Sequence, residues 1–158
     1  MQTISNMQRD SFYKTYLKYL LLFIGLVFYE SITSIYLYLS PLFGVVFFYL
    51  LQNIYKKESI PKVVLGFIYI FIYEIDKGFI PLSFFIFFGF YYHFIYDKIE
   101  YFFNEKIYKI AVHITGGYIG YYVINVMISY LYNYDIPAIN FEYLIYIITD
   151  ILVLVALF

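Results

Sequence analysis

The chain has 158 residues, of which 64% are hydrophobic, 27% aromatic and only 13% charged, and its formal net charge is −1. Soluble domains are about half apolar and about a quarter charged, and disordered chains are poor in aromatic residues, so both classes are excluded. The sequence contains no cysteine, which excludes disulfides, iron–sulfur clusters and Cys-ligated zinc. The charge balance lacks the basic face that nucleic acid requires. The class that remains is an integral membrane protein of one domain.

Six apolar segments follow one another along the chain, and a membrane span needs roughly 20 such residues. They are predicted at about 16–35, 41–55, 61–76, 81–97, 107–132 and 141–158. Pro41, Pro61, Pro81 and Pro137 lie at segment boundaries, where a proline does not interrupt a helix interior. The sequence therefore predicts an all-α integral membrane protein, a bundle of about six transmembrane helices in a single domain over residues 1–158.

The basic residues predict how this bundle is oriented. Nine of the ten Lys and Arg residues precede the first segment or lie in the connections between segments two and three and between four and five; only Lys77 lies on the opposite side. Basic connections stay in the cytoplasm, so we expect both termini to be cytoplasmic. The connection at 97–109, of mixed charge, is predicted to be an interfacial helix along the membrane surface, with a docking loop as the alternative.

Tyrosine is expected to supply the aromatic belts at the membrane surfaces, because the chain has no tryptophan. The tyrosines near predicted segment ends are Tyr91, Tyr92, Tyr96, Tyr130, Tyr132 and Tyr134.

Four acids are candidates for a functional role, because ionisable groups inside a membrane are costly. Glu30 lies near the outer end of the first segment, where it is expected to reach the interface. Glu74 and Asp76 close the third segment, either as functional groups or as loop residues paired with Lys77. Asp150 lies in the middle of the sixth segment. If that segment spans, Asp150 either has a partner such as Asn125 or a tyrosine hydroxyl or is protonated; if the segment is only interfacial, Asp150 faces water.

Gly116 and Gly120 form a G-x-x-x-G pattern in the fifth segment, which predicts close packing of another helix of this chain or of a second subunit. His93 and His113 are expected to be hydrogen-bonded or interfacial residues near the cytoplasmic side, with a proton relay as the alternative. The chain has no catalytic motif that we recognise. Asp76 and Asp150 are predicted at different depths in the membrane, which argues against a pair of aspartates that catalyses intramembrane hydrolysis. We therefore expect no enzymatic activity, no metal site and no cofactor.

The residues Gly66, Phe67, Glu74 and Gly78, with Pro41 opening the second segment, resemble the MreD family of bacterial rod-shape proteins. The chain departs from the family pattern where Glu74 replaces the usual Asp, where Ile70 replaces a mid-span Gly, and where Pro81 and Leu82 follow without a further Gly. The resemblance implies a non-enzymatic scaffold of peptidoglycan elongation in the bacterial inner membrane. It implies an MreC-like partner, with RodA and its transpeptidase as further partners.

The same resemblance implies a fold like that of the substrate-binding subunits of energy-coupling-factor transporters, so a vitamin or micronutrient importer subunit is the alternative. Such subunits dock through Ala-rich stripes in the first span, and here that segment has Gly25 and no Ala. A third possibility is an ion-coupled carrier that uses Glu74 and Asp150, but no inverted repeat supports it.

Overall fold

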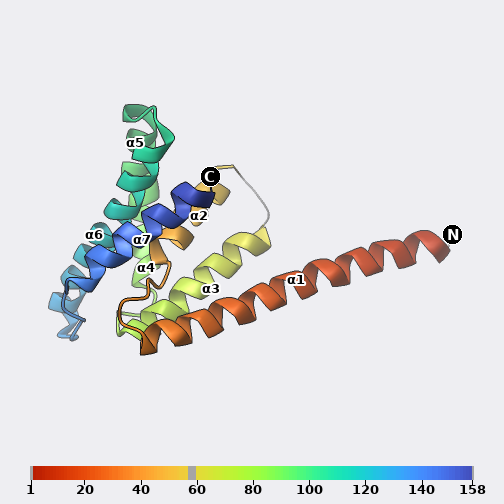
Figure 1. Ribbon diagram of the computed structural model, residues 1–158, viewed down its shortest axis with the longest axis horizontal. Coiled ribbons are helices and arrows are strands. Elements are labelled where there is room, and N and C mark those ends of the chain that lie inside the picture. The colour runs from red at the N-terminus through yellow and green to blue at the C-terminus, as the bar shows by residue number, and fades with distance from the viewer. Residues whose placement is uncertain (1, 57–59, 158) are drawn as a thin grey trace.

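The computed structural model describes the backbone of residues 2–56 and 60–157, and the side chains of residues 17, 18, 20–56 and 60–157. All regular structure in this part of the chain is helical (Figure 1). The helices in chain order are α1 (Gln2–Ile35), α2 (Phe43–Tyr55), α3 (Ile60–Lys77), α4 (Ser83–Tyr91), η1 (Tyr92–Tyr96), α5 (Asp97–Phe102), α6 (Lys106–Tyr132) and α7 (Glu142–Leu157). Three basic residues on which the orientation depends, Arg9, Lys14 and Lys57, have side chains outside the described residues.

The helices α4, η1 and α5 run on without a break, so the described chain forms six helical segments, each of which overlaps a predicted one. The first differs most, because α1 begins at Gln2 and not near residue 16. The residues at both junctions, Tyr92 and Asp97, have right-handed helical backbone angles. The helix ends only at Phe103, whose backbone is extended. The prediction of a separate interfacial helix at 97–109 is therefore wrong. No Gly or Pro lies between Tyr91 and Phe102 to end the helix earlier.

The six segments differ in length. Among the described residues, α6 is the one helix that is both long and apolar enough to cross a bilayer by itself. Helix α2 has 13 residues, which is about 20 Å of helix, and the hydrocarbon core of a bilayer is roughly 30 Å thick.

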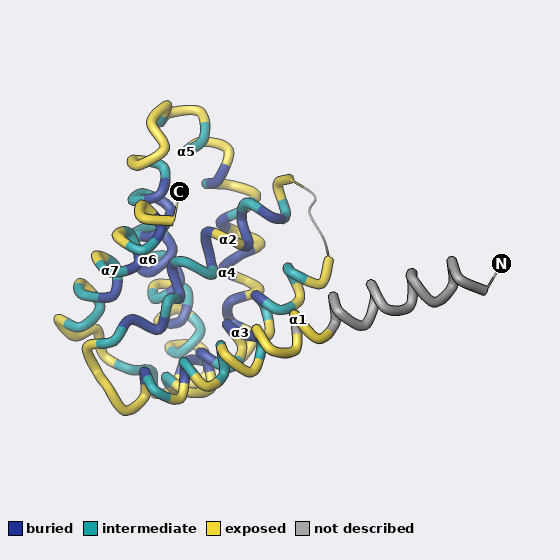
Figure 2. The backbone as a smooth tube through the Cα atoms, turned by 45° about the vertical axis from the view of Figure 1, so that its right-hand side comes forward, coloured by how far each residue is buried: buried dark blue, intermediate teal, exposed yellow. Residues whose placement is uncertain are grey.

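Helix α2 is the centre of the bundle and packs against α3, α6 and α7. Its buried face is largely apolar, and Tyr49 on another face is exposed. Phe43, Phe47, Leu50 and Leu51 are fully buried along it, and Figure 2 shows α2 largely as buried backbone. The helices α1 and α3 pack on one another to one side, and α4 packs on α6.

Aromatic rings fill the core around α2. The ring of Phe43 lies 5.0 Å from that of Tyr121 and 5.1 Å from that of Tyr118 on α6, and Phe47 lies 5.0 Å from Tyr91. Tyr91 and Tyr96 are thus buried, with exposed fractions of 1% and 3%, and their placement in a surface belt is wrong. Both rings pack against the ring of His113 on α6, so they lie on the inner face of their helix.

The other predicted belt residues lie at the surface. Tyr130, Tyr132 and Tyr134 at the end of α6 are exposed, while Tyr92 is half-buried.

Polar groups are buried in this bundle and apolar groups face outward. The buried polar or charged residues are Glu30, Thr33, Ser40, Asn53, Glu74, Ser83, His113, Asn125 and Asp150. Large apolar side chains are exposed at helical spacing on the outer faces: Val64, Ile68, Phe71 and Ile75 on α3, and Leu144, Ile148, Leu152 and Val155 on α7. The core and these outer faces are therefore both apolar, whereas a water-soluble bundle carries polar residues on its outer faces.

Three connections lie at one end of the bundle, at 36–42, 78–82 and 133–141 (Figure 1). We call this end the connection end. The Tyr146 hydroxyl donates to the carbonyl of Leu37 at 2.5 Å, which ties α7 to the first connection. The Ile80 N–H donates to Asn125 Oδ1 at 3.2 Å, which ties the second connection to α6.

Candidate functional site: three buried carboxylates at the connection end

Three acids from three different helices are buried near the connection end. Glu30, Glu74 and Asp150 each have an exposed fraction of 1% or less. Each accepts a hydrogen bond from a tyrosine of another helix: Tyr69 to Glu30 at 2.7 Å, Tyr121 to Glu74 at 3.1 Å and Tyr118 to Asp150 at 2.9 Å. Each pair therefore joins two helices through a hydrogen bond to a carboxylate, a type of bond that is stronger than one between neutral groups.

Asp150 lies against the beginning of α2. Its Oδ2 accepts from the N–H of Gly44 at 2.7 Å, and its Oδ1 accepts from the Ser40 hydroxyl. Gly44 is the second residue of α2, and its N–H is one of the groups that no intrahelical carbonyl can satisfy. The carboxylate also sits at the positive end of the helix dipole. Asp150 thus acts as the N-cap side chain of α2, delivered from α7.

This geometry settles the partner that the sequence left open for Asp150. A tyrosine hydroxyl, that of Tyr118, is confirmed, and Asn125 is wrong. Asn125 instead contacts Ser83 at 3.1 Å and the Ile80 N–H, because it lies one turn beyond Tyr121 on the face of α6 that meets the start of α4.

Glu74 has the same role at the beginning of α4. Its carboxylate accepts from the N–H groups of Leu82 and Phe84, both at 2.7 Å, and from the Ser83 hydroxyl at 2.9 Å. Phe84 is the second residue of α4, as Gly44 is of α2. The suggestion that Glu74 is a loop residue paired with Lys77 is wrong, because it is a buried helix residue that binds a helix start.

The two helix starts share a sequence pattern that the prediction missed. Pro41-Leu42 precedes α2 and Pro81-Leu82 precedes α4. Both leucines occupy the N-cap position with left-handed backbone angles, φ 55° and 69°, and neither makes a side-chain cap. A leucine has no acceptor, whereas most N-caps are Ser, Thr, Asp or Asn. A Pro-Leu pair ahead of an uncapped helix was therefore the available signal that an acceptor must come from elsewhere.

Gly78 completes the turn between α3 and α4. Its φ is +73°, in the region that favours glycine. The N–H of Phe79 donates to the carbonyl of Glu74 at 2.9 Å, the bond that closes a helix C-terminus in a Schellman motif. The backbone of Glu74 thus ends α3 while its side chain begins α4.

Glu30 is buried, and the expectation that it reaches an interface is wrong. Its Oε2 accepts from Tyr69, and its Oε1 lies 3.8 Å from the ammonium of Lys77 without a hydrogen-bond partner. Lys77 also contacts Asp76 at 3.0 Å, and Asp76 accepts from Ser34 at 2.5 Å. The pairing of Asp76 with Lys77 is confirmed, and the same lysine partly neutralises Glu30.

A pocket of about 260 Å³ adjoins this charged group at the connection end. Its walls carry both charge signs and several tyrosines; they include Ser34, Tyr73, Asp76, Lys77, Asn140, Glu142, Tyr143 and Tyr146. Such a lining can bind a small polar molecule.

The G-x-x-x-G glycines face α4 of the same chain. A Cβ on Gly116 would lie 3.0 Å from the Tyr91 hydroxyl, and one on Gly120 would lie 2.8 Å from the Phe87 ring. Gly117 between them faces α2, where a Cβ would lie 2.7 Å from the Phe47 ring. The stripe therefore serves close packing within the chain.

His113 lies near the beginning of α6, toward the end of the bundle opposite the connection end. It is fully buried, and its Nδ1 lies 3.1 Å from the Tyr91 hydroxyl. Its Nε2 lies 3.5 Å from Glu100, which also pairs with Lys109 at 2.5 Å. It is thus hydrogen-bonded, as expected, but not interfacial; His93 is exposed on η1.

Within the described part of the chain, no group of three or more His, Asp and Glu side chains is arranged to hold a metal ion. Comparisons with protein-family models, with curated proteins and with solved structures found no match to this chain.

We expect Tyr118→Phe to lower the free energy of unfolding by about 1.5–3 kcal/mol, because it removes one hydrogen bond to a buried carboxylate. Tyr122→Phe is the matched control, a half-buried tyrosine on the same helix. Both can be compared by urea unfolding in detergent, followed by far-UV circular dichroism. Equal stability of the two variants would mean that the Asp150–Tyr118 bond contributes nothing.

Proposed function

We propose that this chain is a non-enzymatic, multi-pass scaffold of the bacterial inner membrane that acts in cell-shape and peptidoglycan elongation. The observation that carries the membrane location is the outward-facing apolar surface, together with the three buried carboxylates that bind groups of this chain. Exposed apolar faces of this extent on α3 and α7 are unfavourable in water and favourable in lipid. The connection end then faces outward, and the end that bears Lys56, Lys62, Lys98, Lys106 and Lys109 faces the cytoplasm.

The residues that resemble the MreD family support the scaffold role, because each has an architectural function. Gly66 lets α3 approach α2, since a Cβ there would lie 2.6 Å from Leu50. Phe67 stacks on Phe85 of α4 with ring centroids 4.8 Å apart. Glu74 and Gly78 build the turn between α3 and α4. The buried acids hold helix starts in place, which is a structural use of charge.

The shorter helices are compatible with a membrane location. The starts of α2 and α4 have their backbone N–H groups satisfied by Asp150 and Glu74, which meets the requirement that backbone polar groups within a membrane find partners inside the protein. In this proposal an MreC-like protein binds the chain and links it to RodA and its transpeptidase.

An affinity purification of the tagged protein from native membranes in mild detergent, with mass spectrometry, tests this proposal. We expect an MreC-like protein, with RodA or a transpeptidase. Gly120→Leu, which drives a side chain into Phe87, should reduce partner recovery, whereas Gly89→Leu on α4 meets no atom within 4 Å and should not. Gel filtration of each variant separates loss of a partner from loss of the fold.

The pocket at the connection end favours a second candidate, a substrate-binding subunit of an energy-coupling-factor type importer. Its lining includes Asp76, Lys77 and several tyrosines, it holds about 260 Å³, and in the proposed orientation it opens to the outside. If the same purification recovers ABC-type ATPases with a second polytopic subunit, the scaffold proposal is rejected in favour of this one.

A further inference from the structure

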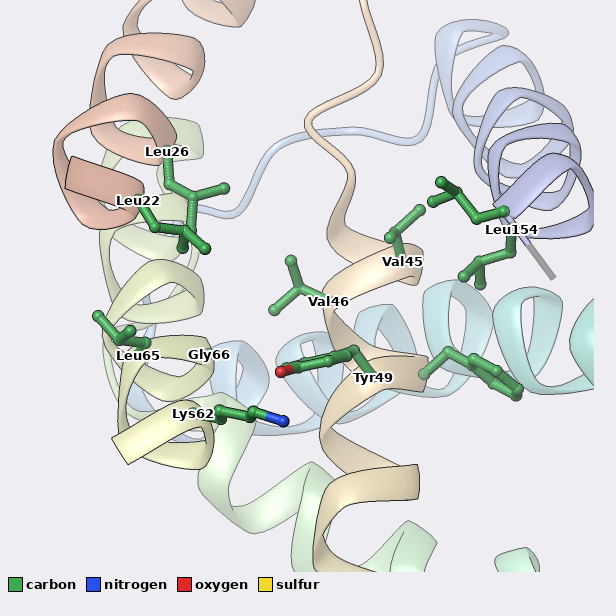
Figure 3. A pocket seen from close by; sticks show the side chains of 11 residues that line it. Leu22, Leu26, Val45, Val46, Tyr49, Lys62, Leu65, Gly66 and Leu154 are labelled. Atoms are coloured by element: carbon green, nitrogen blue, oxygen red, sulfur yellow. The ribbon is translucent and has the colours of Figure 1, made fainter. Parts of the chain in front are cut away.

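A groove crosses the outer surface of α2, separate from the three carboxylates. Its floor is formed by Val45, Val46 and Tyr49, one wall by α1 and α3, and the other wall by Leu154 at the end of α7 (Figure 3). The cavity holds about 450 Å³ and is open to one side. Leu22 and Leu26 of α1 make its wall apolar along most of its length.

One end of this groove is polar. In Figure 3 the ammonium of Lys62, from α3, and the hydroxyl of Tyr49, from α2, point toward one another across the cavity. The groove therefore combines an apolar channel with a cation and a hydroxyl donor at one end, which is complementary to an amphiphile with an anionic head.

We propose that this groove binds one acyl chain of an anionic phospholipid, with the phosphate at Lys62 and Tyr49. Lys62 belongs to the basic end of the bundle, with Lys56 and Lys98. In the proposed orientation this is the cytoplasmic leaflet, where anionic lipids interact with basic residues. The inference rests on the membrane location proposed above, and not on the scaffold role.

The size of the groove favours a lipid chain over a helix from a partner protein. A helix of 10–12 Å diameter occupies roughly 400–600 Å³ in each turn, so the groove would hold only about one turn. Its floor also covers a single turn of α2, from Val45 to Tyr49. A flexible chain can enter such a short groove and leave it toward the bilayer.

Native mass spectrometry of the purified full-length chain tests the proposal, with phosphatidylglycerol or phosphatidylcholine added to delipidated protein in detergent. We expect a retained phosphatidylglycerol molecule and a higher melting temperature, with a weaker effect of phosphatidylcholine. Lys62→Gln should weaken phosphatidylglycerol binding about fivefold, as expected for one lysine at an anionic surface. Lys98→Gln, an exposed lysine at the same end, should not.

Filling the groove provides the second variant. Val46→Phe should weaken binding of both lipids, whereas Val126→Phe on the exposed face of α6 should leave binding unchanged. Equal retention of both lipids by the wild type and all variants would overturn the proposal. So would loss of a co-purified single-span protein in Val46→Phe with the lipid still bound, because that result assigns the groove to a partner helix.

The two proposals can fail separately. A chain that stays monodisperse in buffer without detergent would contradict the membrane location, and with it this inference. A membrane-resident chain without any preference for phosphatidylglycerol contradicts the lipid site alone.

Discussion

Asp150→Ala is expected to lower the free energy of unfolding by about 3–5 kcal/mol, because several buried donors lose their acceptor and each unsatisfied donor costs about 1–3 kcal/mol. The substitution leaves three buried donors, from Ser40, Gly44 and Tyr118, without an acceptor. It also removes the negative charge at the start of α2. The measurement is the midpoint of urea or thermal unfolding in detergent, followed by circular dichroism.

Thr149→Ala is the control for this variant, because it truncates the neighbouring side chain, which is half-buried. If Asp150→Ala yields no folded protein, Asp150→Asn provides the comparison. It keeps an acceptor oxygen and should lose less stability than the alanine variant. Equal stability of Asp150→Ala and Thr149→Ala would show that α2 does not depend on the cap from α7.

Gly117→Leu is expected to destabilise the bundle by about 3 kcal/mol or more, at the upper end of the cost of overpacking a core. A Cβ at Gly117 would already lie 2.7 Å and 2.8 Å from two atoms of the Phe47 ring. That ring is fully buried and stacks parallel to Phe43, so it has little room to move. The melting temperature of the purified variant, relative to the wild type, is the readout.

The control is Gly25→Leu in α1, where a Cβ meets no atom within 4 Å. Leucine is a better helix former than glycine by roughly 0.5–1 kcal/mol, so this variant should be neutral or slightly more stable. The two substitutions are chemically identical, and opposite signs are expected. A similar loss in both would mean that close packing at Gly117 is not what limits stability.

The positions of the helices could largely be predicted from the sequence. Apolar segments and the boundary residues Pro41, Pro61 and Pro81 placed all six helical segments, because these signals are local along the chain. The continuity of α4 into α5 was missed because a mixed-charge stretch was interpreted as a break. The positions of the helices do not by themselves place them in a membrane; that proposal depends on the exposed apolar side chains of α3 and α7.

The roles of the acids were only partly predictable. Burial cost identified Glu30, Glu74 and Asp150 as unusual, and a tyrosine was one of the partners expected for Asp150. The groups that these acids bind could not be predicted, because the backbone N–H that Asp150 binds lies 106 residues away in sequence. Tyr91 and Tyr96 were misplaced for a similar reason, since their partner His113 lies on another helix. Such pairings depend on how helices rotate against each other, which hydropathy does not specify.

The two capped helix starts also imply an order of assembly during synthesis. The acceptor for α4 comes from Glu74, eight to ten residues before the groups that it binds, so α3 and α4 can form a complete hairpin as soon as both have left the ribosome. The acceptor for α2 is on the last helix. Until Asp150 is translated, the Gly44 N–H at the start of the central helix lacks this acceptor, which in the proposed membrane location is costly. The cap on α2 can therefore form only after α7 has been made, later than the cap on α4.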